Sequence, residues 1–163
     1  MKKQLLYLSF LLLISLISCK KSSKKDCGNV TFTTVAFTAD CRPVIIDKTT
    51  TDMFLVIHSV DELKSALHFE NTTGTAQCGT DHSIFSTDFS RQTLIIIKKH
   101  VDGIDATLIN QSLAKNCSDN SINYKAEIKN GGYTAMGNYI GAILIDKIAD
   151  DSKVNFDVKV VKE

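Results

Sequence analysis

The chain has 163 residues and a formal net charge of +1, and 44% of its residues are hydrophobic while 23% are charged. This length suits one ordinary domain, and the composition favours a folded globular body over a disordered chain. A single Pro and 8 Gly exclude collagen-like and Pro-rich low-complexity classes.

The first nineteen residues have the pattern of an export signal. Two lysines at positions 2 and 3 precede an apolar run over 5–17, which is short for a membrane span. The run ends in Leu16-Ile-Ser-Cys19, which resembles the bacterial lipobox. That resemblance implies a lipoprotein signal peptide at 1–18 and fatty acyl chains, such as palmitate, on Cys19. A plain secreted protein and an uncleaved signal anchor are the alternatives.

Charge is distributed unevenly along the rest of the chain. Residues 19–27 are predicted to be a lipidated flexible tether with four lysines, and 28–163 to be a single β-rich domain. From Asp26 onward, 13 basic and 18 acidic side chains give a net charge of −5. The tether suits either anionic headgroups or a solvated spacer, whereas an acidic body is repelled by nucleic acid.

We therefore expect a membrane contact through the lipid anchor and no nucleic-acid partner. The tether lacks the acidic run of some surface-export signals. This favours the periplasmic face of the bacterial outer membrane over the cell surface.

Four cysteines remain after the lipidated one, and an even number in an exported chain predicts two disulfide bonds. They are Cys27, Cys41, Cys78 and Cys117. Of the three possible pairings we favour Cys27–Cys41 with Cys78–Cys117. Unpaired thiols are the alternative. A metal or redox role is disfavoured because the chain has no C-x-x-C and the spacings match no zinc motif.

The first half of the body is predicted to hold three strands and one helix. Alternating residues predict a strand over 30–37, where a shift of phase indicates a bulge at Thr33–Thr34. Pro43 restricts 44–47 to a strand start or an edge, and 53–58 suits a core strand. Ser59 and Glu62 fit a capping box, and apolar spacing continues the helix to about residue 68. Residues 71–80 are polar and predict a loop.

The second half is predicted to be all strand and turn. Residues 93–98 form the most apolar strand, and further strands are predicted over 106–114, 122–129, 139–146 and 154–160. Asp102-Gly103 and Asn130-Gly131-Gly132 are turn sequences, the second read as a hairpin. The fold class is therefore mostly β, with about seven strands and one α-helix, in a β-sandwich or open barrel-like single domain.

Several of these features occur in a familiar order. His58-Ser-Val-Asp-Glu-Leu-Lys64 opens a helix, Asp88-Phe-Ser leads into a strand, and Ala142-Ile-Leu-Ile-Asp-Lys147 precedes a Val-x-Phe-x-Val strand. The region 52–161 resembles the PrcB-like C-terminal domain of small lipoproteins from Bacteroidetes-type bacteria. The resemblance implies a non-catalytic accessory protein with no catalytic residues, and as partner another envelope protein such as a protease or protease complex.

The sequence offers little chemistry of its own. The four histidines form no metal motif, there is no G-x-S-x-G, and only Asp81-His82 near Cys78 gathers ligand types. We therefore predict no enzyme, no catalytic residue, no cofactor and no metal site. The expected function is a protein-binding accessory module of the cell envelope, with Gly131, Gly132, Tyr133 and Tyr139 as contact residues. The alternative is a small-ligand or metal-binding periplasmic lipoprotein that uses the Cys78–His82 loop.

Overall fold

The computed structural model describes residues 26–37, 41–46, 52–71, 83–103, 105–132 and 135–161. Within these residues the chain is mostly β with a single α-helix, as the sequence predicts, and it has ten strands in three sheets where about seven strands were expected. The elements in chain order are β1 (Asp26–Asn29), β2 (Phe32–Val35), β3 (Cys41–Ile45), β4 (Met53–Ile57), α2 (Val60–Ala66), β5 (Leu67–Asn71), the 3-10 helix η1 (Ser83–Ser86), β6 (Gln92–Asp102), β7 (Thr107–Asn116), β8 (Ile122–Lys129), β9 (Met136–Asp146) and β10 (Val154–Val161).

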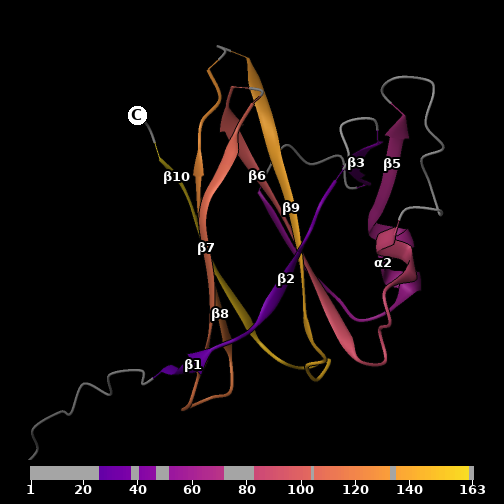
Figure 1. Cartoon of the computed structure of the whole chain (residues 1–163), viewed down its shortest axis with the longest axis vertical. Helices are drawn as coiled ribbons and strands as arrows, with labels where there is room; N and C mark the ends of the chain where they lie inside the picture. Colours follow the sequence, from indigo (N-terminus) through magenta and orange to yellow (C-terminus); the bar gives the residue numbers. More distant parts are fainter. Residues whose placement is uncertain are drawn as a thin grey trace, which may run out of the picture.

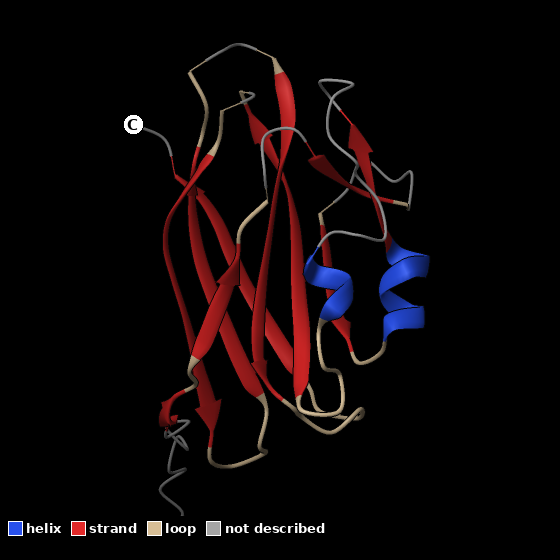
Figure 2. Cartoon of the chain, turned by 45° about the vertical axis from the view of Figure 1, so that its right-hand side comes forward, coloured by secondary structure: helices blue, strands red, loops and turns tan. Residues whose placement is uncertain are grey.

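The sheets form three layers. Sheet A has the order β1-β7-β8-β10, sheet B has the order β2-β9-β6-β4, and sheet C is the pair β3-β5. Figure 1 shows sheet A on the left, sheet B in the centre, and sheet C with α2 on the right. Figure 2 shows α2 and η1 on the side of sheet B away from sheet A. The fold is therefore a β-sandwich with an additional layer on one side.

Sheet B is covered on both faces, which explains the apolar run in β6. Leu94 and Ile96 pack with α2, η1 and sheet C, whereas Ile95 and Ile97 pack against sheet A. All four are at most 2% exposed. A strand buried on both faces has a continuous apolar sequence instead of an alternating one.

Strand β10 shows the opposite pattern because only one of its faces is covered. Val154, Phe156, Val158 and Val160 pack into the core between sheets A and B, as the alternation predicts. The strand runs parallel to β8 at the edge of sheet A. The rings of Phe156 and Phe54 stack with centroids 4.9 Å apart, so the edge strands β10 and β4 face each other across the sandwich.

The helix begins as predicted and ends earlier. Ser59 is the N-cap, and its hydroxyl accepts a hydrogen bond from the Glu62 N–H. The helix stops at Ala66 because Leu67 is already extended and begins β5. Pro43 lies within β3, and since sheet C has two strands both of them are edges, which tolerate proline.

The predicted strand over 30–37 is wrong in detail. The chain pairs with sheet A as β1 and crosses to sheet B as β2, and the β2–β9 register is continuous without a bulge. Phe32 and Val35 lie on opposite faces of β2, and both faces are packed. The shift of apolar phase therefore reflects a double-sided sheet. The first described strand, β1, begins at Asp26.

A further expectation is corrected by the sheet order. Gly131-Gly132 does not form a hairpin, because it joins β8 in sheet A to β9 in sheet B. Residues 53–57 form β4, which packs into the core on both faces as expected and lies at the edge of sheet B. Neither sequence encodes which sheet its strand joins, so the local pattern predicted the strands but not their neighbours.

The favoured disulfide pairing is wrong. Cys27 is bonded to Cys117, with the two Cα atoms 5.0 Å apart. The bond ties β1 to the turn between β7 and β8. Cys41 is also disulfide-bonded and is buried in the core beneath sheet C. Cys78 lies outside the described residues.

Candidate functional site

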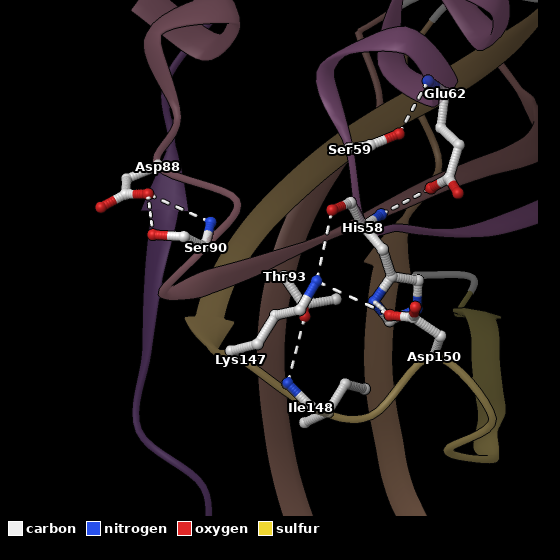
Figure 3. Close-up of polar contacts among 9 residues, drawn as sticks. All are labelled: His58, Ser59, Glu62, Asp88, Ser90, Thr93, Lys147, Ile148 and Asp150. Atoms are coloured by element: carbon white, nitrogen blue, oxygen red, sulfur yellow. Dashed lines mark hydrogen bonds and ion pairs between the residues drawn. The ribbon is translucent and has the colours of Figure 1, made fainter.

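A polar cluster joins the start of α2 to the connection between β9 and β10 (Figure 3). The His58 N–H, one residue before the N-cap, donates to Glu62 Oε2 at 2.6 Å, and the Glu62 N–H donates to the Ser59 hydroxyl at 3.2 Å. Lys147 Nζ donates to the His58 carbonyl at 3.3 Å and lies 3.6 Å from Asp150 Oδ1. The same Asp150 oxygen lies 3.3 Å from His58 Nδ1, in an ion-pair approach without good hydrogen-bond geometry.

These contacts favour a structural role for the cluster. The imidazole of His58 is only 12% exposed, whereas Asp150 is 80% exposed. Beside them, the buried Thr93 hydroxyl accepts a hydrogen bond from the Ile148 N–H at 3.2 Å. Lys147 and Ile148 are thereby fixed to sheet B and to the start of α2. The cluster holds the outer layer on the sandwich.

The Asp88-Phe89-Ser90 segment, which carries part of the family resemblance, forms a local turn. Asp88 Oδ1 accepts hydrogen bonds from the Ser90 hydroxyl at 2.6 Å and from the Ser90 N–H at 3.1 Å. These hydrogen bonds hold the pKa of the Asp88 carboxyl below its usual range. Phe89 is 9% exposed and packs in the core under α2. The motif therefore directs the chain into β6.

No metal site is found in the described part of the chain, since no three His, Cys, Asp or Glu side chains gather there. The Cys78–His82 loop, on which the ligand-binding alternative depends, lies outside the described residues, as do Cys19 and Tyr133. Their predicted roles stay predictions.

The most distinctive surface follows the unpaired edge of β9. Strand β9 pairs with β6 along its whole length, from Met136 to Asp146. On its other side β2 pairs only with Ala142–Ile145, so within the described residues no strand covers that edge over 136–141. Backbone N–H and C=O groups on such an edge are free to bind another strand.

Two adjoining hollows of about 230 and 250 Å³ run along this edge. They share Phe37, Tyr139 and Ile140, and we call them together the β9 slot. The slot lies between the layers: β7 supplies Leu108 and Gln111 on one side, and β3 supplies Arg42 and Pro43 on the other. Its lining residues are Thr34, Val35, Phe37, Arg42, Pro43, Ala106, Leu108, Gln111, Asn138, Tyr139, Ile140, Gly141 and Ala142.

Tyr139, one of the predicted contact residues, is half-buried in the slot. Its ring lies against Gly141, where an added Cβ would come within 2.8 Å of the tyrosine oxygen. The missing side chain at Gly141 therefore makes room for the ring. The β6–β9 register is continuous here, so this is a close approach and not a bulge.

Hydrogen bonds fix one end of the slot. The Tyr124 hydroxyl donates to Gln111 Oε1 at 3.1 Å, and Gln111 Nε2 donates to the Thr34 hydroxyl at 2.9 Å. This chain links sheet A to β2 at the point where β2 ends. Burial raises the pKa of both the Tyr124 and the Tyr139 hydroxyls above the ordinary tyrosine value.

The predicted glycines lie at the end of the sandwich where β6 ends and β9 begins. Gly131 N–H donates to the Asp102 carbonyl at 3.0 Å, and Gly103 packs so closely on Gly131 that an added Cβ would lie 2.5 Å from its oxygen. Gly132 is exposed. Gly131 thus holds the connection from β8 to β9 against the connection from β6 to β7. This is a structural role.

Sequence reasoning found Tyr139 but missed the other slot residues. The pattern placed Phe37 and Leu108 in ordinary strands and singled out no role for Arg42. The sequence also missed the first three residues of β9, whose start was predicted at 139 and lies at Met136. The slot arises because β9 is longer than its neighbour β2.

Comparison with protein-family models, curated proteins and solved structures finds no match to this chain. Among the helices described, none is both long and apolar enough to cross a membrane.

Proposed function

We propose that this chain is a non-catalytic lipoprotein of the bacterial cell envelope whose β-rich body binds another envelope protein as an accessory module. The observation that carries the proposal is the β9 slot. An uncovered strand edge beside apolar walls is a recurring site for binding a segment of another protein. Tyr139 offers an aromatic ring with a polar end, which is a common composition of protein contacts.

We propose that Cys19 carries the anchor, at the periplasmic face of the outer membrane. Support comes from the basic start, the short apolar run and the lipobox-like Leu-Ile-Ser-Cys. Metabolic labelling with an alkyne-tagged palmitate should mark the full chain. C19S should abolish the label while S22A, a change in the same tether, should leave it; labelling of C19S would contradict the anchor.

The proposed partner is another envelope protein, and the PrcB-like resemblance favours a protease or a protease complex. The acidic body, with a net charge of −5 from Asp26 onward, does not suit nucleic acid.

In-cell photocrosslinking tests the binding role. A benzoylphenylalanine residue would replace exposed Asn138 in the slot or, as a matched control, exposed Lys125 on the outer face of sheet A. We expect a discrete adduct with one envelope protein from position 138 only, reduced by Y139A and retained by Y139F. Equal adducts from both positions, or none from position 138, would refute the proposal, with circular dichroism showing that each variant is folded.

A further inference from the structure

We infer that the β9 slot takes one extended peptide segment of the partner as an additional strand of sheet B, with a carboxylate at its C-terminal end facing Arg42. The inference rests on the proposed protein-binding role and specifies the ligand of that site. Three features carry it: the open edge, the two walls and the charge.

The open edge supplies the backbone partner. Residues 136–141 of β9 extend beyond β2, which ends at Val35 opposite Ala142. At about 3.3 Å per residue, six residues give an edge of roughly 20 Å, the length of an ordinary strand. A peptide here would lie along β9 beyond the end of β2, beside Phe37, and would displace no described strand.

The two walls match the alternating side chains of a strand. Tyr139 belongs to the core shared with sheet A, whereas its neighbour Ile140 belongs to the core beneath sheet C. Leu108 lines the first wall, and Phe37, whose ring centroid lies 6.0 Å from that of Phe69, lines the second. Since stacked sheets lie about 10 Å apart, the layers leave room for one strand, and its successive side chains point to opposite walls. Because both walls are apolar, they favour apolar or β-branched side chains at successive positions of the segment.

Charge sets the end group. Among the described residues that line the slot, Arg42 is the only charged one. Glu70 lies opposite Arg42 in the β3–β5 register, but its recorded ion pair is with His68, at 3.8 Å. A guanidinium at an apolar slot favours a carboxylate, which it binds with paired hydrogen bonds.

The orientation follows from the sheet. Every pair in sheet B is antiparallel. A peptide antiparallel to β9 runs in the direction of β2, so its C-terminal end reaches Asn138 and Arg42, which line the same hollow. The carboxylate is therefore either that of the chain terminus or that of an acidic residue beside it.

Synthetic probes test this with the full chain in detergent micelles. The probe is the octapeptide GSVTVTVE with fluorescein on its N-terminus and a free C-terminus, and its binding would be followed by fluorescence anisotropy. We expect saturable binding, and a loss of about tenfold or more when both threonines become proline, because proline cannot donate to the ladder. Replacing the glutamate by glutamine and amidating the terminus, first separately and then together, identifies which carboxylate is used. Loss of the carboxylate that binds Arg42 should weaken peptide binding about fivefold.

Protein variants locate the site. R42Q should weaken the binding of GSVTVTVE by the same factor. Removing the carboxylate from the peptide should not weaken its binding to R42Q any further. R91Q, which changes the other arginine at an exposed site beside Asp88 and Asp146, should bind as the parent chain does. Hydrogen exchange of the 136–141 amides should slow when the peptide is added.

Several results would overturn strand addition. One is that GSVTVTVE shows no saturable binding, and another is that the proline peptide binds as tightly as GSVTVTVE. A third is that R42Q and R91Q lose the same amount of peptide affinity. The last is that the peptide slows hydrogen exchange in β10 or β4 in place of 136–141. The proposed function is tested separately: a position-138 adduct in cells with a negative peptide result would retain the accessory role and reject this mode of binding. Peptide binding without any cellular adduct would retain this mode of binding and reject the accessory role.

Discussion

The double-sided burial of sheet B can be tested by shortening neighbouring side chains on β6. Ile95 faces sheet A and Ile96 faces the outer layer, and they are 1% and 0% exposed. Replacing either by alanine removes three carbon atoms, about 2.4 kcal/mol at ~0.8 kcal/mol per methylene, and leaves a cavity. We expect I95A and I96A each to lower the free energy of unfolding by about 3–4 kcal/mol.

The assay is urea unfolding followed by far-ultraviolet circular dichroism, with the disulfides intact. I109A is the matched control, since Ile109 lies on β7 and is 56% exposed, and it should cost less than about 1 kcal/mol. In a two-layer sandwich, one of two neighbouring strand residues would face solvent. A small cost for I96A with a large cost for I95A would therefore refute the third layer.

Three shorter predictions concern other parts of the fold. G103A should destabilise the chain by more than G28A. Both glycines have positive φ, but only at Gly103 would an added Cβ meet backbone, at 2.5 Å. Equal urea midpoints for the two variants would contradict this. Burial alone would raise the pKa of Asp52, but hydrogen bonds from Lys99 and from the His100 N–H outweigh it and leave the pKa below its usual value. The stability from Asp52 is thus present above about pH 4 and lost as the pH falls through the lowered pKa, so D52N should flatten the acid limb of a stability–pH curve; an unchanged limb would count against the contact. C27S should lower the unfolding free energy by about 4 kcal/mol, since the bond spans a sequence separation of 90, and a midpoint unaffected by reductant would disagree.

The local sequence pattern was sufficient for elements whose pattern depends only on which of their faces is buried. The Ser59–Glu62 capping box and the alternation of Val154 to Val160 each depend on residues close in the chain, and both are observed. The helix end failed because Leu67 continues the apolar stripe of a helix while its side chain is buried equally well from a strand.

Features set by the order of strands could not be predicted in this way. Cys27 pairs with Cys117 because β1 lies beside β7, and no nearby residue encodes that neighbour. The β9 slot has the same origin, since it depends on where β2 leaves the sheet and on what sheet C places opposite. Tyr139 was named from the sequence as an aromatic contact residue, whereas Arg42 joins it only through the third layer.

The Cys27–Cys117 bond also determines how the molecule carries mechanical load. Strand β1 has only exposed described side chains and a short, irregular pairing with β7, so its hydrogen bonds alone would yield easily to a pull on the N-terminus. The covalent bond passes that force directly to the turn between β7 and β8. Everything between the two cysteines, including β2 to β7, is then bypassed, and stretching the ends can extend only the chain from Cys117 onward, roughly 150 Å at ~3.4 Å per residue. A body held at its N-terminus is therefore held through the turn between β7 and β8, and the six strands β2 to β7 are shielded from tension.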